Sequence, residues 1–408
     1  MTDPPRFRYF LSDNAHPVLP GSALWSDPLP MHPATPTAGA GAWRYGDYFE
    51  ALTTFLLADG LPAVSAVLSG RAGRPIAVRD LADLRIYLEK HGQFYHPARV
   101  EIAPGDGAFV INAALSAAGQ NIIDAEYRLL QRLGQQFASP YLPRVFARGR
   151  VRSGGARQIH LFLGEWFEEY HEFHLTWDPA RRRRRIRVWH PQHTGLFLSR
   201  RQTLDLYTRA AWILTSFYDI ETLAQIYPWH HAAGDFVVRR IEDRIDLKLI
   251  TVRRYRSPLD DQEVRTEDRD PAWLMQGLLI FLVNLSIRMR LDRLDGVGRM
   301  VWAAAEAVEG TLCGFLAALQ TKTRPACLPA PPADCFRVYL LTLGRQVWTD
   351  TARDILAACD PRSPERPVIE AHLRQHVADL YDGVRALLGR CGGHPSGGPS
   401  DGPGDEGE

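Results

Sequence analysis

Lysine is nearly absent from this chain of 408 residues, which contains only Lys90, Lys248 and Lys322. Arginine carries almost all of the positive charge, a bias typical of GC-rich bacterial genomes, and the formal net charge is only +1. A chain so close to neutrality has no overall field to attract nucleic acid or an anionic membrane, so we expect neither as a partner. The scarcity of lysine also restricts where a phosphate-binding lysine can lie.

Cysteine is scarce too, and its distribution argues against a disulfide framework or a metal cluster. All five cysteines lie in the last quarter of the chain: Cys313, Cys327, Cys335, Cys359 and Cys391. Their odd number and wide spacing favour a reduced, cytoplasmic compartment. The N-terminus, Met-Thr-Asp-Pro-Pro-Arg, also lacks the apolar core of a signal peptide.

Long apolar runs are missing as well. The most apolar stretch, residues 272–284, is interrupted by Gln276 and Asn284. It is shorter than the roughly 20 apolar residues that a bilayer span needs, so it predicts a buried core helix. The overall composition, 45% hydrophobic and 23% charged, is typical of a globular protein.

The two ends of the chain have the least periodicity. Residues 1–42 are rich in Pro, Ala, Gly and Ser and predict an irregular lead-in, and the Gly- and Pro-rich residues 392–408 predict a disordered tail. Between these ends, residues 43–170 alternate between helical and strand patterns, whereas residues 171–391 are mainly helical. The pattern therefore predicts an α+β protein with a small β-rich part and a larger helical part.

Periodicity also locates the individual elements. Apolar spacing predicts helices over residues 48–59, 78–91, 121–134, 201–218, 271–290, 299–320, 334–358 and 366–390. Alternation and turn residues predict strands over 98–102, 108–115, 144–150, 158–167, 173–177 and 186–189. A further short hairpin is predicted within residues 227–255.

The most informative motif is Tyr-Pro-Trp-His-His-Ala-Ala-Gly-Asp-Phe-Val-Val at residues 227–238, followed by Asp-Leu-Lys-Leu-Ile-Thr-Val at 246–252. It has the outline of a kinase catalytic loop that leads into a hairpin. Glu126 lies in a preceding predicted helix, and residues 164–170 form a last strand and connecting segment before the long helix 201–218. Over residues 95–390 the chain resembles the protein-kinase-like superfamily, in particular its aminoglycoside-phosphotransferase-like branch.

The resemblance implies a two-lobed fold with a nucleotide cleft, but key residues differ from the family pattern. The position of the catalytic aspartate falls on His230, and that of the second metal-binding aspartate falls on Thr251. No lysine lies between Lys90 and Lys248, and Asn112 is near the usual place of the phosphate lysine. The glycine-rich loop is reduced to residues 104–107. These are the groups by which such enzymes orient phosphates and metal ions.

Carrying the resemblance over residue by residue gives a set of candidate site residues. His230 and Asp235 are candidate catalytic residues, and Asp235 is also the candidate magnesium ligand. The candidate contacts of ATP or another nucleotide are Glu126, Asn112, Glu165, Trp166, Phe167, Thr251 and Arg253. Each has a structural alternative: His230 and Asp235 can shape the loop, and Arg253 can pair with a surface carboxylate such as Glu242, Asp243 or Asp260.

Two further clusters have open roles. His171-Glu172-Phe173-His174 suggests a metal site, but on a strand residues three apart face opposite sides, which favours polar residues that line a cleft. Arg181–Arg185 is a run of five arginines that could bind phosphate or nucleic acid. Its place at a predicted hairpin tip favours a solvated loop.

Three functions remain open at this point. The first is a pseudokinase-type binding or regulatory module that holds a nucleotide, or a protein or small-molecule partner, in its cleft. The second is an atypical phosphotransferase or nucleotide transferase that uses His230, Asp235 and an arginine, with magnesium as its metal ion. The third is a scaffold whose cleft binds a metal or metabolite through His171, His174 and His230. A fold alone does not decide among them.

Overall fold

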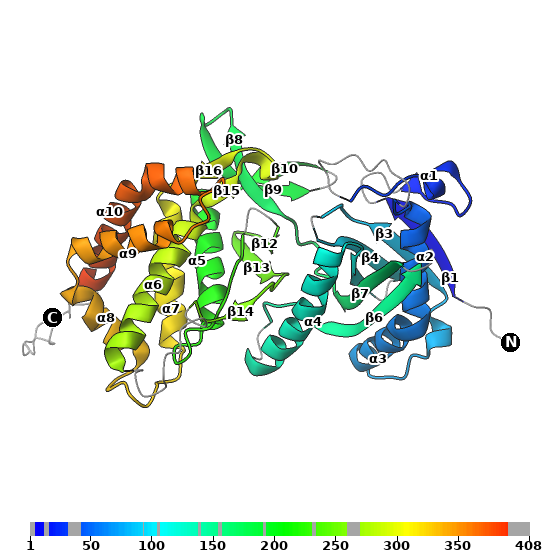
Figure 1. Cartoon of the computed structure of the whole chain (residues 1–408), viewed down its shortest axis with the longest axis horizontal. Coiled ribbons are helices and arrows are strands. Elements are labelled where there is room, and N and C mark those ends of the chain that lie inside the picture. Colours follow the sequence, from blue (N-terminus) through cyan, green and yellow to red (C-terminus); the bar gives the residue numbers. More distant parts are fainter. Residues whose placement is uncertain are drawn as a thin grey trace, which may run out of the picture.

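The protein is an α+β protein whose β-rich and helical parts lie at opposite ends of the molecule (Figure 1). The computed structural model describes residues 5–11, 16–31, 42–92, 94–103, 107–137, 140–153, 157–190, 193–230, 234–258 and 270–390. The predicted disordered tail and the turn at 104–106 lie outside these residues.

The first half of the chain supplies a mixed seven-stranded sheet with the strand order β2-β1-β3-β4-β5-β7-β6. Its strands are β1 (Arg6–Leu11), β2 (His16–Pro17), β3 (Asp83–Leu88), β4 (His96–Ala103), β5 (Ala108–Ala114), β6 (Val145–Ser153) and β7 (Arg157–Glu165). β1 pairs parallel with β3, and the other neighbours are antiparallel. The helix α4 (Ala117–Phe137) connects β5 to β6.

The two faces of this sheet pack into different cores. One face lies against α2 (Tyr45–Phe55), the single π-helical turn Leu56–Gly60 and α3 (Leu61–Ala72). The opposite face lies toward α4 and the helical half, and Tyr127 and Phe162 belong to the core on that side. Because strand side chains alternate, the charged residues of β3 and β4 lie together on this second face.

The second half begins with a three-stranded sheet formed by β8 (Phe173–Asp178), β9 (Arg183–His190) and β10 (His193–Phe197). The helices are α5 (Arg200–Ser216), α6 (Pro271–Met289), α7 (Glu306–Gln320), α8 (Pro332–Thr342), α9 (Arg345–Ala357) and α10 (Arg366–Arg390). Short pairs complete it: β11 (Gln225–Ile226) with β14 (Tyr255–Arg256), β12 (Phe236–Ile241) with β13 (Arg244–Leu249), and β15 (Leu291–Arg293) with β16 (Met300–Trp302).

The contact between α5 and α7 depends on a glycine. A Cβ atom at Gly314 would lie 2.0 Å from the carbonyl oxygen of Thr208, so only glycine lets these helices approach so closely. α5 is also joined to the β12–β13 hairpin, because Oδ2 of Asp205 accepts the backbone N–H of Ile245 over 3.0 Å.

Most predicted elements are confirmed, but several differ. The helix expected over 299–320 begins only at Glu306, after the strand β16. The predicted helix over 78–91 is wrong: a 3₁₀ turn at Val78–Asp80 is followed by the strand β3. Leu84, Ile86 and Leu88 are buried at alternate positions, and pairing with β1 and β4 selects the strand. β1 extends the sheet where an irregular lead-in was expected. The helix expected over 334–358 is divided at Leu343 and Gly344 into α8 and α9.

Two helical segments among the described residues are long and apolar enough to cross a membrane by length and composition alone: Tyr45–Ala72 and Pro271–Met289. In the most apolar windows of the first and the second segment, 44% and 67% of residues are buried inside the protein. Both segments contribute side chains to the hydrophobic cores. Core helices of soluble proteins pass the same test of length and composition, so one or two such segments are weak evidence of a membrane span.

Candidate functional site

Asp235 lies immediately before β12, and both oxygens of its carboxylate accept hydrogen bonds. The backbone N–H of His230 donates to Oδ2 over 2.7 Å, and the Thr251 hydroxyl donates to Oδ1 over 2.8 Å. The Arg253 guanidinium donates to both oxygens, over 2.7 and 2.6 Å. Asp235 itself is only 1% exposed. The buried carboxylate is therefore neutralised by a bidentate arginine.

Arg253 is the sequence candidate whose role differs most from the alternatives considered. It was expected either to contact nucleotide phosphates or to pair with a surface carboxylate. Its guanidinium points instead to Asp235, and its side chain is 24% exposed. Burial by itself lowers the pKa of Arg253, but the hydrogen bonds to Asp235 outweigh it and raise that pKa. The cation beside Asp235 is thus supplied by the chain itself.

Glu126 carries the second buried carboxylate of the site. It connects α4 to the segment that follows β13. Its Oε1 accepts the backbone N–H of Val252 over 2.6 Å, and its Oε2 accepts the Tyr95 hydroxyl over 2.5 Å. The side chain is 1% exposed. Burial raises the pKa of Glu126, while these two hydrogen bonds and the charge of Arg253 oppose the rise. Glu126 therefore joins Tyr95, just before β4, to the segment after β13, and a lysine takes no part in this contact.

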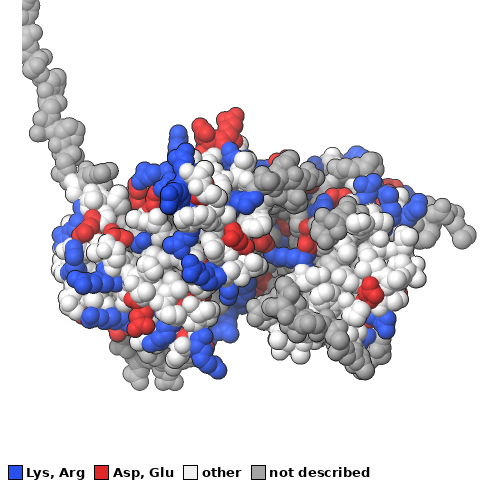
Figure 2. Space-filling view, turned by 90° about the horizontal axis from the view of Figure 1, so that it is seen from above, with Lys and Arg blue, Asp and Glu red and all other residues white. Residues whose placement is uncertain are grey.

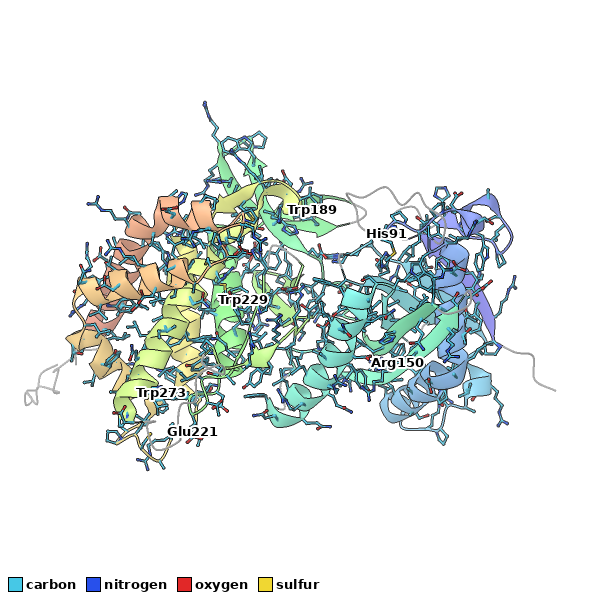
Figure 3. The ribbon with its side chains drawn as sticks, in the orientation of Figure 1. His91, Arg150, Trp189, Glu221, Trp229 and Trp273 are labelled. Atoms are coloured by element: carbon cyan, nitrogen blue, oxygen red, sulfur yellow. The ribbon has the colours of Figure 1, made fainter. Side chains whose placement is uncertain are left out.

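His230 lies beside Asp235 in the chain, but its ring contacts the start of α10. Nε2 is 3.0 Å from Oε1 of Glu365, which also forms an ion pair with Arg288. Burial opposes ionisation of Glu365, but the hydrogen bonds and positive charges of His230 and Arg288 lower its pKa to about 2. The other ring nitrogen, Nδ1, is buried. The neighbouring Trp229 is 4% exposed and lies next to β12 (Figure 3). His231 lies outside the described residues.

The cluster at 171–174 forms ion pairs rather than a set of metal ligands. His174 Nδ1 lies 3.3 Å from Oδ1 of Asp292, and its Nε2 lies 3.9 Å from Glu172. Burial lowers the pKa of His174, but its hydrogen bonds to Asp292 and Glu172 outweigh this and raise it to about 9. A metal ion at His174 would have to displace this proton and the ion pair with Asp292. Within the described residues, no group of three or more His, Cys, Asp or Glu side chains could hold a metal ion.

Lys90 approaches the same loop from the end of β3, not from a helix as expected. Its Nζ forms an ion pair with Glu172. A Cβ atom at Gly234 would lie 2.6 Å from Oε1 of Glu172 and 3.2 Å from the Lys90 ammonium. Gly234 has φ +72° as well, so the backbone there requires glycine for two reasons. The Lys90–Glu172 pair thus rests directly against the backbone that precedes Asp235.

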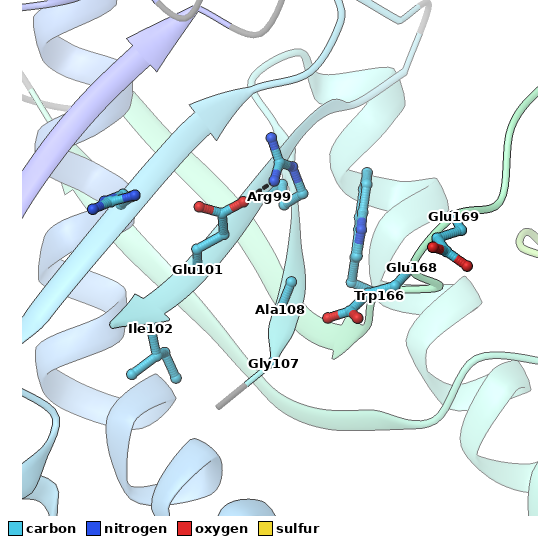
Figure 4. A pocket seen from close by; sticks show the side chains of 9 residues that line it. Arg99, Glu101, Ile102, Gly107, Ala108, Trp166, Glu168 and Glu169 are labelled. Carbon is cyan, nitrogen blue, oxygen red and sulfur yellow. Dashed lines mark hydrogen bonds and ion pairs between the residues drawn. The ribbon is translucent and has the colours of Figure 1, made fainter. Parts of the chain in front are cut away.

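A cavity of about 490 Å³ opens between the charged face of β3 and β4 and the segment after β7 (Figure 4). Its lining residues are Arg85, Arg99, Glu101, Ile102, Gly107, Ala108, Trp166, Glu168 and Glu169. Arg99 lies between two aromatic rings, with its guanidinium 4.3 Å from the centroid of Tyr87 and 5.8 Å from that of Trp166. It also forms ion pairs with Glu89 and Glu101. One wall of the cavity is therefore an aromatic ring, and two of its charged lining residues, Arg99 and Glu101, pair with each other.

The predicted nucleotide contacts divide into three groups. Only Trp166 lines the cavity. Glu126, Thr251 and Arg253 belong to the buried network around Asp235. The other three lie elsewhere: Glu165 pairs with Arg144, Phe167 lies 5.7 Å from the Lys248 ammonium, and Asn112 sits in β5 opposite Pro97 and Phe162.

Several residues of the site were missed by the sequence analysis. Arg99 and Glu101 were missed because the strand at 98–102 was predicted without asking toward which side its charged residues point. Alternation along β3 and β4 contains that signal. Glu365 and Tyr95 reach the site from distant segments, and nothing in local periodicity points to them.

Comparison with protein-family models and with curated protein sequences finds no relative of this chain.

Proposed function

We propose that this protein is a non-catalytic binding module with a two-lobed, kinase-like architecture, of the pseudokinase type. The order of its elements supports the architecture: antiparallel strands, the helix with Glu126, a last strand and connecting segment, the long helix α5, and then a loop and hairpin. That is the order that the resemblance implies. The buried contact between Glu126 and Val252 supports it as well.

The observation that carries the proposal is the bidentate contact of Arg253 with Asp235. Phosphoryl transfer uses magnesium ions that bridge the nucleotide phosphates, and the protein must offer them free carboxylate oxygens. Both oxygens of Asp235 already accept hydrogen bonds from the chain, and Thr251 stands where the second carboxylate is expected. A magnesium ion would have to displace the half-buried guanidinium of Arg253 and leave its charge without a partner.

The cavity beside Trp166 favours a planar base over a triphosphate. An indole ring is a stacking surface for a purine, and carboxylates accept hydrogen bonds from its amino group. Glu101, Glu168 and Glu169 line the cavity together with Arg85 and Arg99, so the lining carries no excess of positive charge. We therefore expect a nucleotide to bind through its base, without a metal ion.

Thermal unfolding tests this binding mode directly. Adenosine should raise the melting temperature at least as much as ATP does, and magnesium should add nothing. At about ten times its Kd a ligand adds about 1.4 kcal/mol to stability. In a chain of this length that corresponds to a rise of about 2 °C. The measurement is a thermal-shift titration with adenosine, ATP and ATP plus magnesium.

Trp166→Ala should abolish the rise in melting temperature, because it removes the stacking surface. Trp189→Ala is the matched control, since Trp189 is exposed and does not line the cavity. If ATP raises the melting temperature only with magnesium, or if Trp166→Ala has no effect, the proposed binding mode is wrong.

An atypical phosphotransferase is the second candidate, because the pairing of His230 with Glu365 is the kind that orients a catalytic imidazole. Its buried Nδ1 and the position of Arg253 weigh against it. This candidate predicts ATP turnover that His230→Ala or Asp235→Ala removes while the protein stays folded. A phosphate-release assay on the wild-type protein with magnesium-ATP decides between the two.

We also propose a cytoplasmic location. Cys313, Cys327, Cys335 and Cys359 are free thiols, as is usual in a reducing compartment.

A further inference from the structure

The hairpin of β8 and β9 projects from the body of the molecule and concentrates positive charge (Figure 1). Six arginines and one aspartate lie between Thr176 and Arg187, a net charge of +5 in a chain whose total is +1. The total charge therefore hides a strongly basic segment. In the view from above, the side toward which the hairpin projects, Lys and Arg side chains lie among Asp and Glu over the helical half (Figure 2).

Four of these arginines, Arg181 to Arg184, are exposed at the turn and the start of β9. Among the described residues, only Arg185 of the five-arginine run has a carboxylate partner, Asp178, at 2.6 Å. That pair also organises the turn, because Asp178 accepts the backbone N–H groups of Ala180 and Arg181. The turn is thus held in shape while four guanidinium groups face solvent.

Two exposed tryptophans accompany the arginines. Trp177 is 52% exposed and lies directly opposite Arg184 in the strand register. Trp189 is 40% exposed near the foot of the hairpin (Figure 3), and the Arg187 guanidinium lies 5.4 Å from the centroid of its ring. Indole rings are costly to leave in water, and their exposure next to arginines marks an interaction surface.

We propose that the β8–β9 hairpin binds single-stranded nucleic acid. Arginine forks donate paired hydrogen bonds to phosphate oxygens, and an exposed indole stacks on an unpaired base. The combination of both groups on one hairpin matches the alternation of phosphate and base along a single strand. This inference is independent of the cleft and of the nucleotide proposed for it.

The hairpin fits two other polyanions less well. An anionic membrane would be met by apolar or aromatic side chains at the tip, with basic groups behind them. Here the outermost turn, residues 179–182, carries arginines, and Trp177 lies behind it. An acidic peptide pairs with the arginines but leaves Trp177 without a flat partner.

Fluorescence anisotropy with a labelled 12-nucleotide oligouridine, at salt concentrations from 50 to 200 mM, tests the proposal on the full chain. We expect binding that weakens with salt. Replacing Arg181, Arg182, Arg183 and Arg184 with alanine should lower the slope of log K against log salt by about 3, because each lost contact to a single strand removes about 0.7. Trp177→Ala keeps every charge and should weaken binding about 5- to 100-fold, through the lost stacking.

A charge-matched control separates this site from general attraction. Alanine at Arg74, Arg79, Arg353 and Arg362, four exposed arginines outside the hairpin, removes the same charge and should leave binding nearly unchanged. Trp177→Phe should retain most of the affinity. The proposal is overturned if no oligonucleotide binds, if the control weakens binding as much as the hairpin variant, or if Trp177→Ala has no effect. Tighter binding of phosphatidylserine vesicles or polyglutamate by the same arginines would also overturn it.

Discussion

Replacing Arg253 with alanine should lower the free energy of unfolding by about 3–5 kcal/mol, the range for breaking one side of a buried ion pair. Asp235 is 1% exposed and would keep only two of its four donors, the His230 backbone N–H and the Thr251 hydroxyl. A carboxylate so buried cannot regain water as a substitute. Urea unfolding followed by circular dichroism measures the change.

The neighbouring Arg254 provides the matched control, because it is exposed. Arg254→Ala should change stability by less than about 0.5 kcal/mol. Combining Asp235→Asn with Arg253→Ala should recover part of the loss, since no buried charge then remains without a partner. Equal effects of Arg253→Ala and Arg254→Ala would contradict the central role given to the Asp235–Arg253 pair.

Raising the pH from 6.5 to 9 should remove about 3 kcal/mol of stability through His174 alone. Its pKa is about 9 in the folded protein and 6.5 ordinarily. Each pKa unit corresponds to about 1.4 kcal/mol. A raised histidine pKa contributes stability that is complete below the unfolded pKa, and that is lost as the pH rises through the folded pKa. The physical cause is the ion pair with Asp292, which is itself 1% exposed.

Unfolding free energies of the wild type and of His174→Gln, measured from pH 6 to 9.5, isolate this contribution. Other groups titrate in both proteins, so their difference reports on His174. The difference should shrink as the pH rises. His16→Gln, at an exposed position, should follow the wild-type profile throughout. A constant difference between wild type and His174→Gln would mean that His174 is neutral in the folded protein.

Both predictions concern carboxylates whose partners come from the chain itself. Asp235 is paired with Arg253, Glu365 with His230 and Arg288, and Asp292 with His174. Groups that could hold a metal ion or activate a hydroxyl are thus occupied. This pattern is the reason that we propose a binding module rather than a phosphotransferase.

The sequence predicted correctly those elements whose apolar spacing fits either a helix or a strand, but not both. The helix α4 has a clear apolar stripe over more than five turns, and β4 and β5 alternate around a turn. Residues 78–91 satisfied two patterns at once. Leu81, Leu84 and Tyr87 have helical spacing, while Leu84, Ile86 and Leu88 have strand spacing. The partners on both sides of β3 decide between them, and those partners lie outside any local window.

The sequence indicated which residues lie near one another in the candidate site, but not which of them contact each other. Glu126, Asp235, Thr251 and Arg253 do come together, as the motif suggested. Their pairing could not be deduced, because which carboxylate an arginine meets depends on loop geometry in three dimensions. The contact of His230 with Glu365 joins residues 135 positions apart, a distance over which local patterns contain no information.

Isothermal titration of the wild-type protein with ATP, once in EDTA and once in excess magnesium, shows whether nucleotide binding depends on a metal ion. If Arg253 holds the place of the metal ion, the two dissociation constants should agree within about twofold, since a tenfold difference already means about 1.4 kcal/mol of metal contact. Affinity at least tenfold higher with magnesium would show that Asp235 can bind the ion, and would contradict the account. Absence of binding under both conditions would overturn the nucleotide cavity.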